Sequence, residues 1–586
     1  MFEHKWFLLL LLISFFMHNT SVMAIERMVA IDNPYAQDTG TGLVSAPYKT
    51  LSYAMSQLKP GDHLTVMAGT YRDALVFPEK VWTRIDEKLI DSGKINNTDL
   101  VKANQTIIEG KGEVLIKGSD LITNWRHLGN GRFVKTWLEE PQQVFINEKP
   151  LNQIGGTIFG GFPEKPNHPL ATLHKTQKGI WPGRRAGDQN LMPENSFYYH
   201  SSRNLPSLNG HTVEVSVRPT LLGGKGVTDI TIKNLRFQHA NTSTTRRGGL
   251  ISMSGIRITI NNLHVNQADS VGFALIGNDI SLLNSSANQC GQLGILARGM
   301  RMQLKNNQTN DNNTRGFNKW WEAGGAKFVG NGGLQDSIVS NHQALRNFGD
   351  GIWFDWKNRN NTVQNSFSAY NTGFGIHYEA SDQGHIINNI VLANQQRGIY
   401  LIHSSKSLVA FNLVASSQMQ GIAIVDENRR DTTSEFDFGA NGNQVFGNVI
   451  AWNVGSLVLP TKIADNTSDY NVFIGDDDHT RSGLGWINMF MATLGEWSTR
   501  TQQDKHSLHI KIPIGIAYKE SITHKNIPNL DWYALLRDDF KHLTLSPELE
   551  KLIIDTRDLR PGANFSPKLA LSPYPSLALE SSPTAF

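Results

Sequence analysis

The stretch that decides the fold runs GDGIWFDWKNRNNTVQNSFSAYNTGFGIHYEAS, from Gly349 to Ser381. It contains one pattern twice, 24 residues apart: GIWFD ends at Asp355 and GIHYE ends at Glu379. Short apolar strands that recur at such intervals are typical of proteins built from stacked coils. If the coils stack in register, Asp355 and Glu379 lie on adjacent strands, about 4.8 Å apart, and point the same way.

The same interval extends along the chain from about residue 229 to about residue 475. Asn and Gly recur together every 22 to 24 residues, and one interval of 35 predicts an insertion at residues 320–333. Asn at a coil corner can adopt a left-handed backbone and stack into ladders, while Gly suits tight corners. The recurring positions are Asn262, Asn284, Asn306, Asn341, Asn365, Asn389 and Asn412, with Gly272, Gly294, Gly316, Gly351, Gly375, Gly398 and Gly421.

The chain begins with features of a secretory signal peptide at residues 1–24. Lys5 precedes an apolar run from Trp6 to Phe16, and small or apolar residues close the segment at Ala24. The run is short for a membrane span, so we expect cleavage and a secreted or periplasmic protein, with an uncleaved anchor as the alternative. No membrane contact is expected after cleavage.

Residues 25–122 read as an N-terminal cap followed by the first coils. Thr50 is placed to cap a short helix, a strand follows at residues 64–67, and a further coil is expected over Gln105–Lys117. This string resembles the N-terminal cap of secreted right-handed parallel β-helix proteins of the pectate-lyase-like superfamily. A helix of this kind covers the apolar end of a solenoid.

The sequence therefore predicts an all-β protein, a right-handed parallel β-helix with an inserted domain. The repeat is lost over residues 123–219, which we interpret as a small β-sandwich, with long loops as the alternative. The main β-helix occupies residues 220–480. Residues 481–586 form a tail that packs on the β-helix. We expect a short helix and loop at residues 493–508, a helix at residues 530–540, and disorder over the proline-rich last 26 residues.

Composition narrows the ligands that the chain could bind. The formal net charge is +3 over 586 residues, which gives no argument for nucleic acid or for a strongly acidic polymer. Cys290 is the only cysteine, so no internal disulfide can form, and we expect it to be a small buried residue. An uncharged or weakly charged oligo- or polysaccharide fits this balance better than DNA.

The acid pair carries the chemistry. Four residues after successive glycines stand Arg298, Trp320, Asp355, Glu379, Ile402 and Val425, so two neighbouring members of this column are acidic. Stacked like charges repel, which makes a purely structural role unfavourable. Two carboxyl groups about 5 Å apart match the separation in retaining glycosidases, where one attacks the anomeric carbon and the other supplies a proton.

Aromatic residues surround the pair in sequence and could stack on sugar rings. Strand alternation puts Trp353 on the same face as Asp355. The candidate substrate-binding residues are Trp320, Trp321, Trp353, Trp356, Tyr378, His342 and His377.

The segment GIWFDWKNRNNTVQNSFSAYNTGFGIHYEAS also resembles glycoside hydrolase family 120, the β-xylosidases built on a right-handed β-helix with an inserted β-sandwich. By that resemblance Asp355 would be the nucleophile and Glu379 the acid/base. The preceding WEAGGAKF is similar to a family segment with a third acid, which makes Glu322 a supporting candidate. The resemblance implies no metal or other cofactor.

Two other classes remain open. A polysaccharide lyase or uronan epimerase would need a base and a Ca²⁺ ion or arginine opposite the substrate carboxylate. Its candidates are His342, His377, His403, Lys327 and Arg298, with Asp350, Asp355 and Glu379 as Ca²⁺ ligands. A non-catalytic polysaccharide-binding β-helix is the third class and leaves the acid pair unexplained. The sequence leaves the oligomeric state open.

Overall fold

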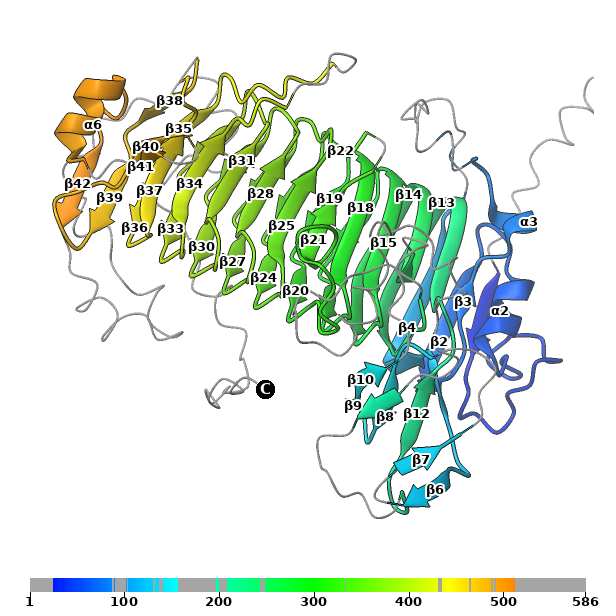
Figure 1. Ribbon diagram of the computed structural model, residues 1–586. Helices are drawn as coiled ribbons and strands as arrows, with labels where there is room; N and C mark the ends of the chain where they lie inside the picture. The colour runs from blue at the N-terminus through cyan, green and yellow to red at the C-terminus, as the bar shows by residue number, and fades with distance from the viewer. Residues whose placement is uncertain are drawn as a thin grey trace, which may run out of the picture.

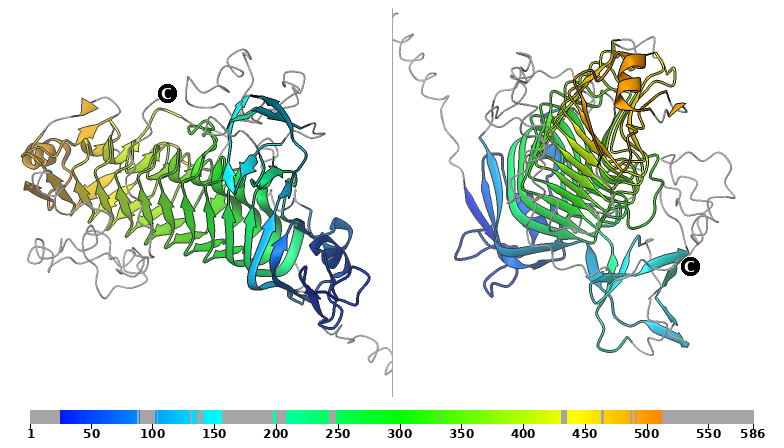
Figure 2. Two further views of the ribbon diagram at one scale, coloured as in Figure 1. Left: turned by 90° about the horizontal axis from the view of Figure 1, so that it is seen from below. Right: turned by 90° about the vertical axis from the view of Figure 1, so that its left-hand side faces the viewer.

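The computed structural model describes residues 25–86, 89, 102, 104–129, 132–135, 141–155, 197–199, 208–242, 248–330, 332–429, 435–462, 465–485, 488–489 and 492–511. The signal peptide, the helix expected at residues 530–540 and the proline-rich end lie outside this range and stay predictions. The described chain is a long right-handed β-helix whose coils stack one behind another (Figures 1 and 2).

The coils build three parallel faces, because each coil contributes one strand to each face. Two strands, β13 (Leu222–Gln238) and β14 (Gly249–Asn266), are long enough to run around the corners, and β14 pairs with the first strand of all three faces. The first face continues through β15 (Val271–Asn278), β18 (Leu293–Met300), β21 (Gly324–Phe328), β25 (Asp350–Asp355), β28 (Ile376–Glu379), β31 (Ile399–Ile402), β34 (Gln420–Val425) and β37 (Gly455–Leu459).

The second and third faces are made of three- or four-residue strands in the same parallel order. The second holds β16 (Ser281–Leu283), β19 (Gln303–Lys305), β23 (Ile338–Ser340), β26 (Thr362–Gln364), β29 (His385–Ile387), β32 (Leu408–Ala410), β35 (Gln444–Phe446) and β38 (Thr467–Asp469). The third holds β17 (Ser286–Asn288), β20 (Gln308–Asn310), β24 (Gln343–Leu345), β27 (Phe367–Ala369), β30 (Ile390–Leu392), β33 (Leu413–Ala415), β36 (Val449–Ala451), β39 (Val472–Gly475) and β42 (Leu508–Lys511). The predicted stacking is confirmed.

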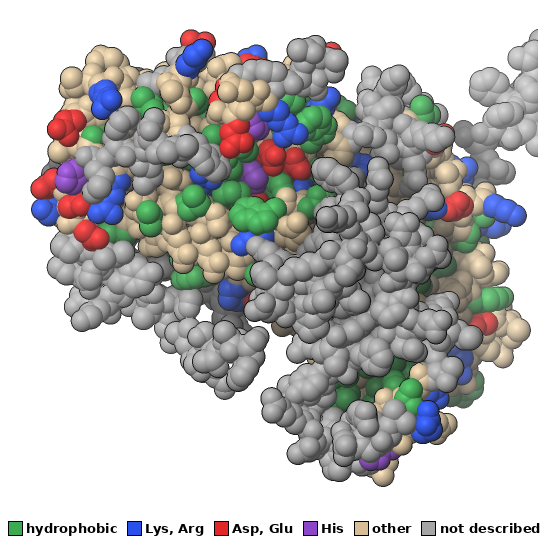
Figure 3. All heavy atoms as spheres, in the orientation of Figure 1, with side chains coloured by type: hydrophobic (Ala, Val, Ile, Leu, Met, Phe, Trp, Pro, Cys, Tyr) green, Lys and Arg blue, Asp and Glu red, His purple; other side chains and the backbone are tan. Residues whose placement is uncertain are grey.

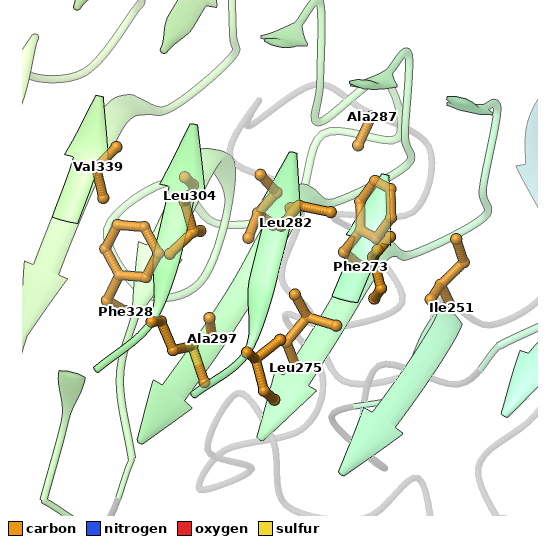
Figure 4. Packing of buried hydrophobic residues seen from close by; sticks show 14 of the residues in the cluster. Ile251, Phe273, Leu275, Leu282, Ala287, Ala297, Leu304, Phe328 and Val339 are labelled. Atoms are coloured by element: carbon orange, nitrogen blue, oxygen red, sulfur yellow. The ribbon is translucent and has the colours of Figure 1, made fainter. Parts of the chain in front are cut away.

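The interior of the solenoid is a continuous apolar column. Side chains alternate along each strand, so every second residue faces inward and stacks on its equivalent in the next coil. Figure 4 shows this packing, in which Leu275 of β15 lies beside Ala297 of β18, and Ala297 lies beside Phe328 of β21. Cys290 belongs to the same cluster, and burial raises the pKa of its thiol to about 12.

Asparagine ladders mark the corners, and the column predicted from the sequence runs through two of them. Asn284, Asn306 and Asn341 have positive φ angles, and their side-chain amides hydrogen-bond from coil to coil at 2.9 Å. Asn389 and Asn412 lie one position further along their coils and form an inner ladder that continues to Asn448. The single column predicted from the sequence therefore merges an outer and an inner ladder.

The N-terminal end is covered as predicted. Helix α2 (Leu51–Gln57) begins after Thr50, whose hydroxyl accepts a hydrogen bond from the Tyr53 amide, and it buries Leu51, Ala54 and Met55 in the core. The adjoining elements are β1 (Glu26–Val29), β2 (His63–Tyr71), β3 (Leu75–Val76), α3 (Glu79–Trp82) and β4 (Thr106–Lys117). Their parallel pairing with one another and with β13 forms the first coils.

The segment between β4 and β13 leaves the solenoid and projects from its side (Figure 2). Its described strands form an antiparallel sheet in the order β5 (Ser119–Leu121), β12 (Val213–Ser216), β8 (Val144–Ile146) and β9 (Lys149–Pro150). Two further pairs are β6 (Arg126–Gly129) with β7 (Arg132–Val134) and β10 (Asn152–Gly155) with β11 (Phe197–Tyr199). A second packed sheet is not part of the described chain, so the sandwich stays a prediction.

A buried ionic cluster joins this sheet to the solenoid. The Lys117 ammonium lies 2.7 Å from Glu148 and 2.9 Å from Glu214, and Arg72 binds Glu214 from the other side. Burial alone would raise the pKa of Glu214, but hydrogen bonds from Lys117 and Arg72 hold it below its usual value. Burial lowers the pKa of the adjacent His239 to about 4. Although Glu148, Glu214 and His239 have metal-ligand spacing, a lysine already supplies the cation.

The C-terminal end carries the predicted short helix. Helix α6 (Leu494–Thr501) begins with a capping box in which Thr493 and Glu496 bind each other's backbone amides. Trp497 is buried against the last coils, and its indole N–H donates to Asp504 at 2.9 Å. A short pair, β40 (Gly483–Leu484) and β41 (Asn488–Met489), precedes it.

Candidate active site

The register of β25 and β28 places Asp355 directly opposite Glu379, as the sequence predicts. In the same register Trp353 lies opposite His377, whereas Phe354 and Tyr378 face the solenoid core. Adjacent strands are about 4.8 Å apart. Asp355 and Glu379 therefore project side by side from the outer side of the first face, with side chains 21% and 22% exposed.

Lys327 of β21 binds Asp355. Its ammonium lies 2.9 Å from the Asp355 carboxylate and 3.1 Å from the centroid of the Trp353 ring, and it donates to the carbonyl of Trp321. Lys327 and Trp353 are paired in the strand register, and both are buried. A buried ammonium in this position stabilises Asp355 as a carboxylate, which is the form of a nucleophile.

Glu379 has a different environment. Arg429 lies 3.3 Å from one carboxylate oxygen, and Nε2 of His377 lies 3.7 Å from the other. Arg429 also stacks over the Trp356 ring at 4.6 Å. The two acids are thus distinguished: a buried lysine binds Asp355, while Glu379 lies between a partly exposed arginine and a histidine.

His377 is fixed by a buried carboxylate. Asp350, at the start of β25, accepts a hydrogen bond from Nδ1 of His377 at 2.9 Å, and its other oxygen accepts from the Phe374 amide at 2.8 Å. Asp350 and His377 are 3% and 5% exposed. Because Nδ1 faces a carboxylate, the ring nitrogen that faces Glu379 is Nε2.

Three rings from successive coils stack beside the acid pair. Trp353 and His377 have ring centroids 5.0 Å apart, and His377 and Tyr400 have centroids 5.1 Å apart, both in stacked geometry. All three side chains are buried, yet the indole Nε1, the imidazole Nε2 and the phenol oxygen make no hydrogen bond. Buried polar atoms are normally paired, so this row of three presents unused hydrogen-bonding capacity on the outer face.

Tyr400 keeps its proton in this environment. Burial raises the pKa of the Tyr400 hydroxyl, Arg397 opposes the shift, and the carboxylates of Glu427 and Glu379 add to it. The Arg397 guanidinium stacks over the Tyr400 ring at 4.4 Å. The hydroxyl therefore remains available as a hydrogen-bond donor close to Glu379.

Two insertions flank the face at opposite ends of the strands. The first is divided by β21: most of its residues precede the strand, because Leu293 pairs with Gly324, and the rest follow it within residues 329–333, because Gly299 pairs with Leu334. The predicted span 320–333 is therefore right only in part. Gly325, not Gly316, is consequently the glycine of this coil, and Trp320 does not belong to the Asp355 column. Trp320 instead lies in the inserted loop, 52% exposed, with its ring edge against Phe374.

The second insertion follows β34 and was not recognised from the sequence. Asn412 and Asn448 are adjacent in the inner ladder although 36 residues separate them. The described part of this insertion brings Arg429 to Glu379 and packs Phe438 against Trp356 at 5.5 Å. The interval of 36 residues between these asparagines could have revealed the second insertion, just as the interval of 35 residues upstream revealed the first.

Two predicted binding residues are wrong. Tyr378 is fully buried in the core, where its hydroxyl donates to the Asp382 carbonyl at 2.9 Å. His342 occupies the inner corner ladder, bonds Thr309 at 2.9 Å, and has a pKa lowered to about 4 by burial. Strand alternation turns the first inward, and the corner position turns the second inward, so neither faces the acid pair.

The remaining predicted residues are distributed around the face. Trp321 and Glu322 lie in the loop directly before β21, with Trp321 bound to Lys327 through its carbonyl and Glu322 buried, its carbonyl accepting from Gln292. The role of Glu322 as a third acid stays a prediction. Arg298 projects from the outer side of β18, two coils before Asp355, and His403 is buried after β31 near Asp426.

The carboxylates suggested as Ca²⁺ ligands bind protein cations or a histidine instead. Lys327 pairs with Asp355, Arg429 with Glu379 and His377 with Asp350. Among the described residues these three acids do not form a group with metal-ligand spacing. Figure 3 shows acidic, basic and histidine side chains gathered among apolar ones on this side of the middle coils.

Sequence and structure comparisons agree with the architecture. The family model "Right handed beta helix region" matches residues 248–414, which cover the coils from β14 to β33. No curated protein matches the sequence. Within the described chain, no helix is long and apolar enough to cross a membrane.

Solved structures with a similar fold include XylC in complex with xylose, which is 17% identical, with 77% of this chain and 76% of that chain covered and a TM-score of 0.49. The mannuronan C-5 epimerase AlgE6 A-module of Azotobacter vinelandii is 11% identical, with 77% and 91% covered and a TM-score of 0.41. Pectate lyase Pel9A is 11% identical, with 77% and 81% covered and a TM-score of 0.35. At this level of similarity none of them assigns a reaction to this chain.

Proposed function

We propose that this chain is a retaining glycoside hydrolase that acts outside the cytoplasm on a β-xyloside or a related neutral glycoside. The observation that carries the proposal is the register of β25 and β28, which sets Asp355 and Glu379 side by side on one outer face. Strand spacing of about 4.8 Å favours retention, because inverting enzymes need roughly 6.5–9.5 Å between carboxyl groups to admit a water molecule.

The environments of the two acids support different roles. Asp355, held as a carboxylate by Lys327, attacks the anomeric carbon and forms a glycosyl ester as the bond to the leaving oxygen breaks. Glu379 gives its proton to that oxygen, so the leaving group departs neutral. Glu379 then takes a proton from water, which attacks the anomeric carbon and returns the bonding electrons to Asp355.

The ring stack supports a sugar as the ligand. Trp353 and Tyr400 offer two buried and unpaired polar atoms beside the acids, and a sugar ring carries hydroxyl groups that can both donate and accept. At the ends of the strands Trp320 and Trp356 remain partly accessible and could stack on further sugar units. The neutral balance of Lys327 and Arg429 against the two acids favours an uncharged substrate.

Product analysis tests the proposal. The purified chain is incubated with a panel of aryl glycosides, β-xylosides among them, and nuclear magnetic resonance identifies the anomer that forms first. We expect release of sugar with retained configuration and no effect of a chelator. An inverted first product, or activity only on non-glycosidic substrates, contradicts the assignment.

One observation favours a second candidate, a uronan lyase or epimerase. His377, oriented by Asp350 and with Nε2 unpaired, has the arrangement of a general base, and Lys327 and Arg429 could neutralise a substrate carboxylate. The same experiment, extended to uronan polymers, separates the two. An unsaturated product that absorbs near-ultraviolet light selects the lyase, and a C-5 epimer selects the epimerase.

A further inference from the structure

We propose that Asp350 and His377 form a positioning dyad that keeps the catalytic proton on Glu379. The inference rests on the proposed glycosidase function and goes further, because it assigns a proton-holding role to Asp350, a buried residue that does not line the face. The dyad would act through Glu379, without itself touching the reacting atoms.

The hydrogen bonds of Asp350 set the form of His377. An ionised carboxylate only accepts hydrogen bonds, and both Asp350 oxygens are engaged, one by the Phe374 amide and one by Nδ1 of His377. Nδ1 therefore carries a hydrogen. In a neutral imidazole the other nitrogen, Nε2, then has a lone pair and can only accept.

That lone pair faces Glu379. Nε2 of His377 lies 3.7 Å from a Glu379 oxygen and has no hydrogen-bond partner, although the ring is buried. A lone pair opposite an ionised carboxylate is unfavourable, whereas a proton on the Glu379 carboxyl removes this repulsion and lets the two atoms close from 3.7 Å to hydrogen-bond distance. The geometry therefore favours the site with one proton loaded, which is the state that the first step of the reaction needs.

The stack holds the imidazole in this orientation. His377 lies between the rings of Trp353 and Tyr400, and Phe374 packs edge-on against it at 4.7 Å. With both faces covered and Nδ1 bound, the ring cannot rotate without losing the Asp350 hydrogen bond. The dyad is thus as fixed as the coils that carry it.

Other charges around Glu379 act in opposite directions. Arg429, 3.3 Å away, favours the ionised form, and Asp355 on the adjacent strand favours the protonated form. Tyr400 faces His377 and carries no charge, while Lys327 lies over Trp353 and binds Asp355. The dyad opposes the effect of Arg429, because Nε2 of His377 is a hydrogen-bond acceptor for the proton on Glu379.

The test replaces Asp350 by Asn, with Asp311→Asn as the matched control on a surface ion pair with Arg346. The oxygen of the substituted side chain can still accept from Phe374, but its amide group then faces Nδ1 and moves the ring hydrogen to Nε2, where it favours ionised Glu379. We expect kcat/KM to fall about 100-fold for glycosides with poor leaving groups. For dinitrophenyl glycosides, which need little acid assistance, the change should stay within a few-fold.

The pH profile is the second readout. Because the D350N variant favours ionised Glu379, the alkaline limb of its kcat/KM profile should move to lower pH, and D311N should leave the profile unchanged. A second variant, His377→Phe, keeps a ring in the stack and removes both nitrogens, and it should show the same dependence on the leaving group. If D350N does not fold, the His377→Phe variant alone tests whether the dyad keeps the proton on Glu379.

The outcomes separate the two proposals. If D350N loses equal activity on both substrates and its pH profile does not move, Asp350 is merely structural. That result overturns the dyad proposal and leaves the proposed glycosidase function intact. If the wild-type chain gives an inverted or unsaturated product, or cleaves no glycoside, the proposed function falls and the dyad falls with it.

Discussion

Two groups of coils on the first face differ in their outer surface while sharing one interior. In β15 and β18 the outward pairs are Ala274 with Leu296 and Ile276 with Arg298. In β25 and β28 the equivalent pairs are Trp353 with His377 and Asp355 with Glu379. The inward positions of both groups are apolar or aromatic and belong to one core.

This difference shows where a solenoid can acquire chemistry. Inward residues must stack on the next coil, and corner residues must adopt left-handed backbone or join a ladder, so these positions are constrained. Outward residues carry no such requirement. A carboxylate pair, a buried lysine and a ring stack can therefore be added to two or three coils without altering the backbone that repeats on either side.

Removing the nucleophile should give the largest difference in activity between substitutions in the two groups of coils. Asp355→Ala is expected to lower kcat/KM by at least about 10³-fold, because it removes the nucleophile and leaves only Glu379, which serves as the acid/base. Azide should not restore turnover with retention. Asp279→Asn, which removes an acid bound to Arg301 among the upstream coils, should change the activity less than two-fold. Aryl glycoside hydrolysis measures both, and comparable losses would contradict the assignment.

Removing the acid/base should have an effect that depends on the substrate. Glu379→Ala is expected to lower kcat/KM by about 10²- to 10⁴-fold on poor leaving groups and much less on activated ones. Azide should accelerate the variant and yield a glycosyl azide of unchanged anomeric configuration, which nuclear magnetic resonance identifies. An azide product of opposite configuration would mean that Asp355 is not the nucleophile.

The sequence predicted the repeat and the register well because both are periodic. Glycine spacing alone paired Asp355 with Glu379, and the structure confirms that pairing. The same glycine spacing also defines a second column, two residues after the glycine of each coil. Its members on successive strands are Lys327, Trp353, His377 and Tyr400. Tyr400 was absent from the candidates because the aromatic residues were chosen for their proximity to the acids in the sequence. Their position in this column was not considered.

The errors came from features that periodicity does not encode. Tyr378 is adjacent to Glu379 in sequence and on the opposite side of the strand in space, which alternation predicts but sequence proximity conceals. The partners of the acids come from insertions and neighbouring coils, as with Arg429, and no interval within one coil identifies them. The carboxylate of Asp350 lies behind His377 and is recognisable only once the coils are stacked.

Acidification should destabilise the inner corner at His342. Its pKa is lowered to about 4 by burial, against a usual value near 6.5. Between these values the unfolded chain binds a proton that the folded chain does not, so stability falls as pH decreases from about 6.5 to about 4, by up to roughly 1.4 kcal/mol per pH unit. The melting temperature between pH 7 and pH 5 measures this fall.

His342→Asn tests the origin of that slope. The inner ladder already contains Asn307 and Asn389, so an asparagine fits the position without a titrating group. We expect the variant to lose less stability on acidification than the wild-type chain. An unchanged slope would assign the acid sensitivity to other buried histidines, such as His239 at the junction with the inserted sheet.

The smallest expected effects come from two tyrosines that distinguish the inner from the outer side of the first face. Tyr378 points inward and its hydroxyl donates to the Asp382 carbonyl, whereas Tyr400 points outward and its hydroxyl is unpaired. Tyr378→Phe should reduce the free energy of unfolding by about 1 kcal/mol and leave kcat/KM unchanged, because it removes one core hydrogen bond. Tyr400→Phe should leave stability unchanged and raise KM, because it removes a donor that the substrate uses. Thermal unfolding and steady-state kinetics on the two variants decide the comparison, and a reversal of the two effects would mean that sugar recognition does not occur on the outer face.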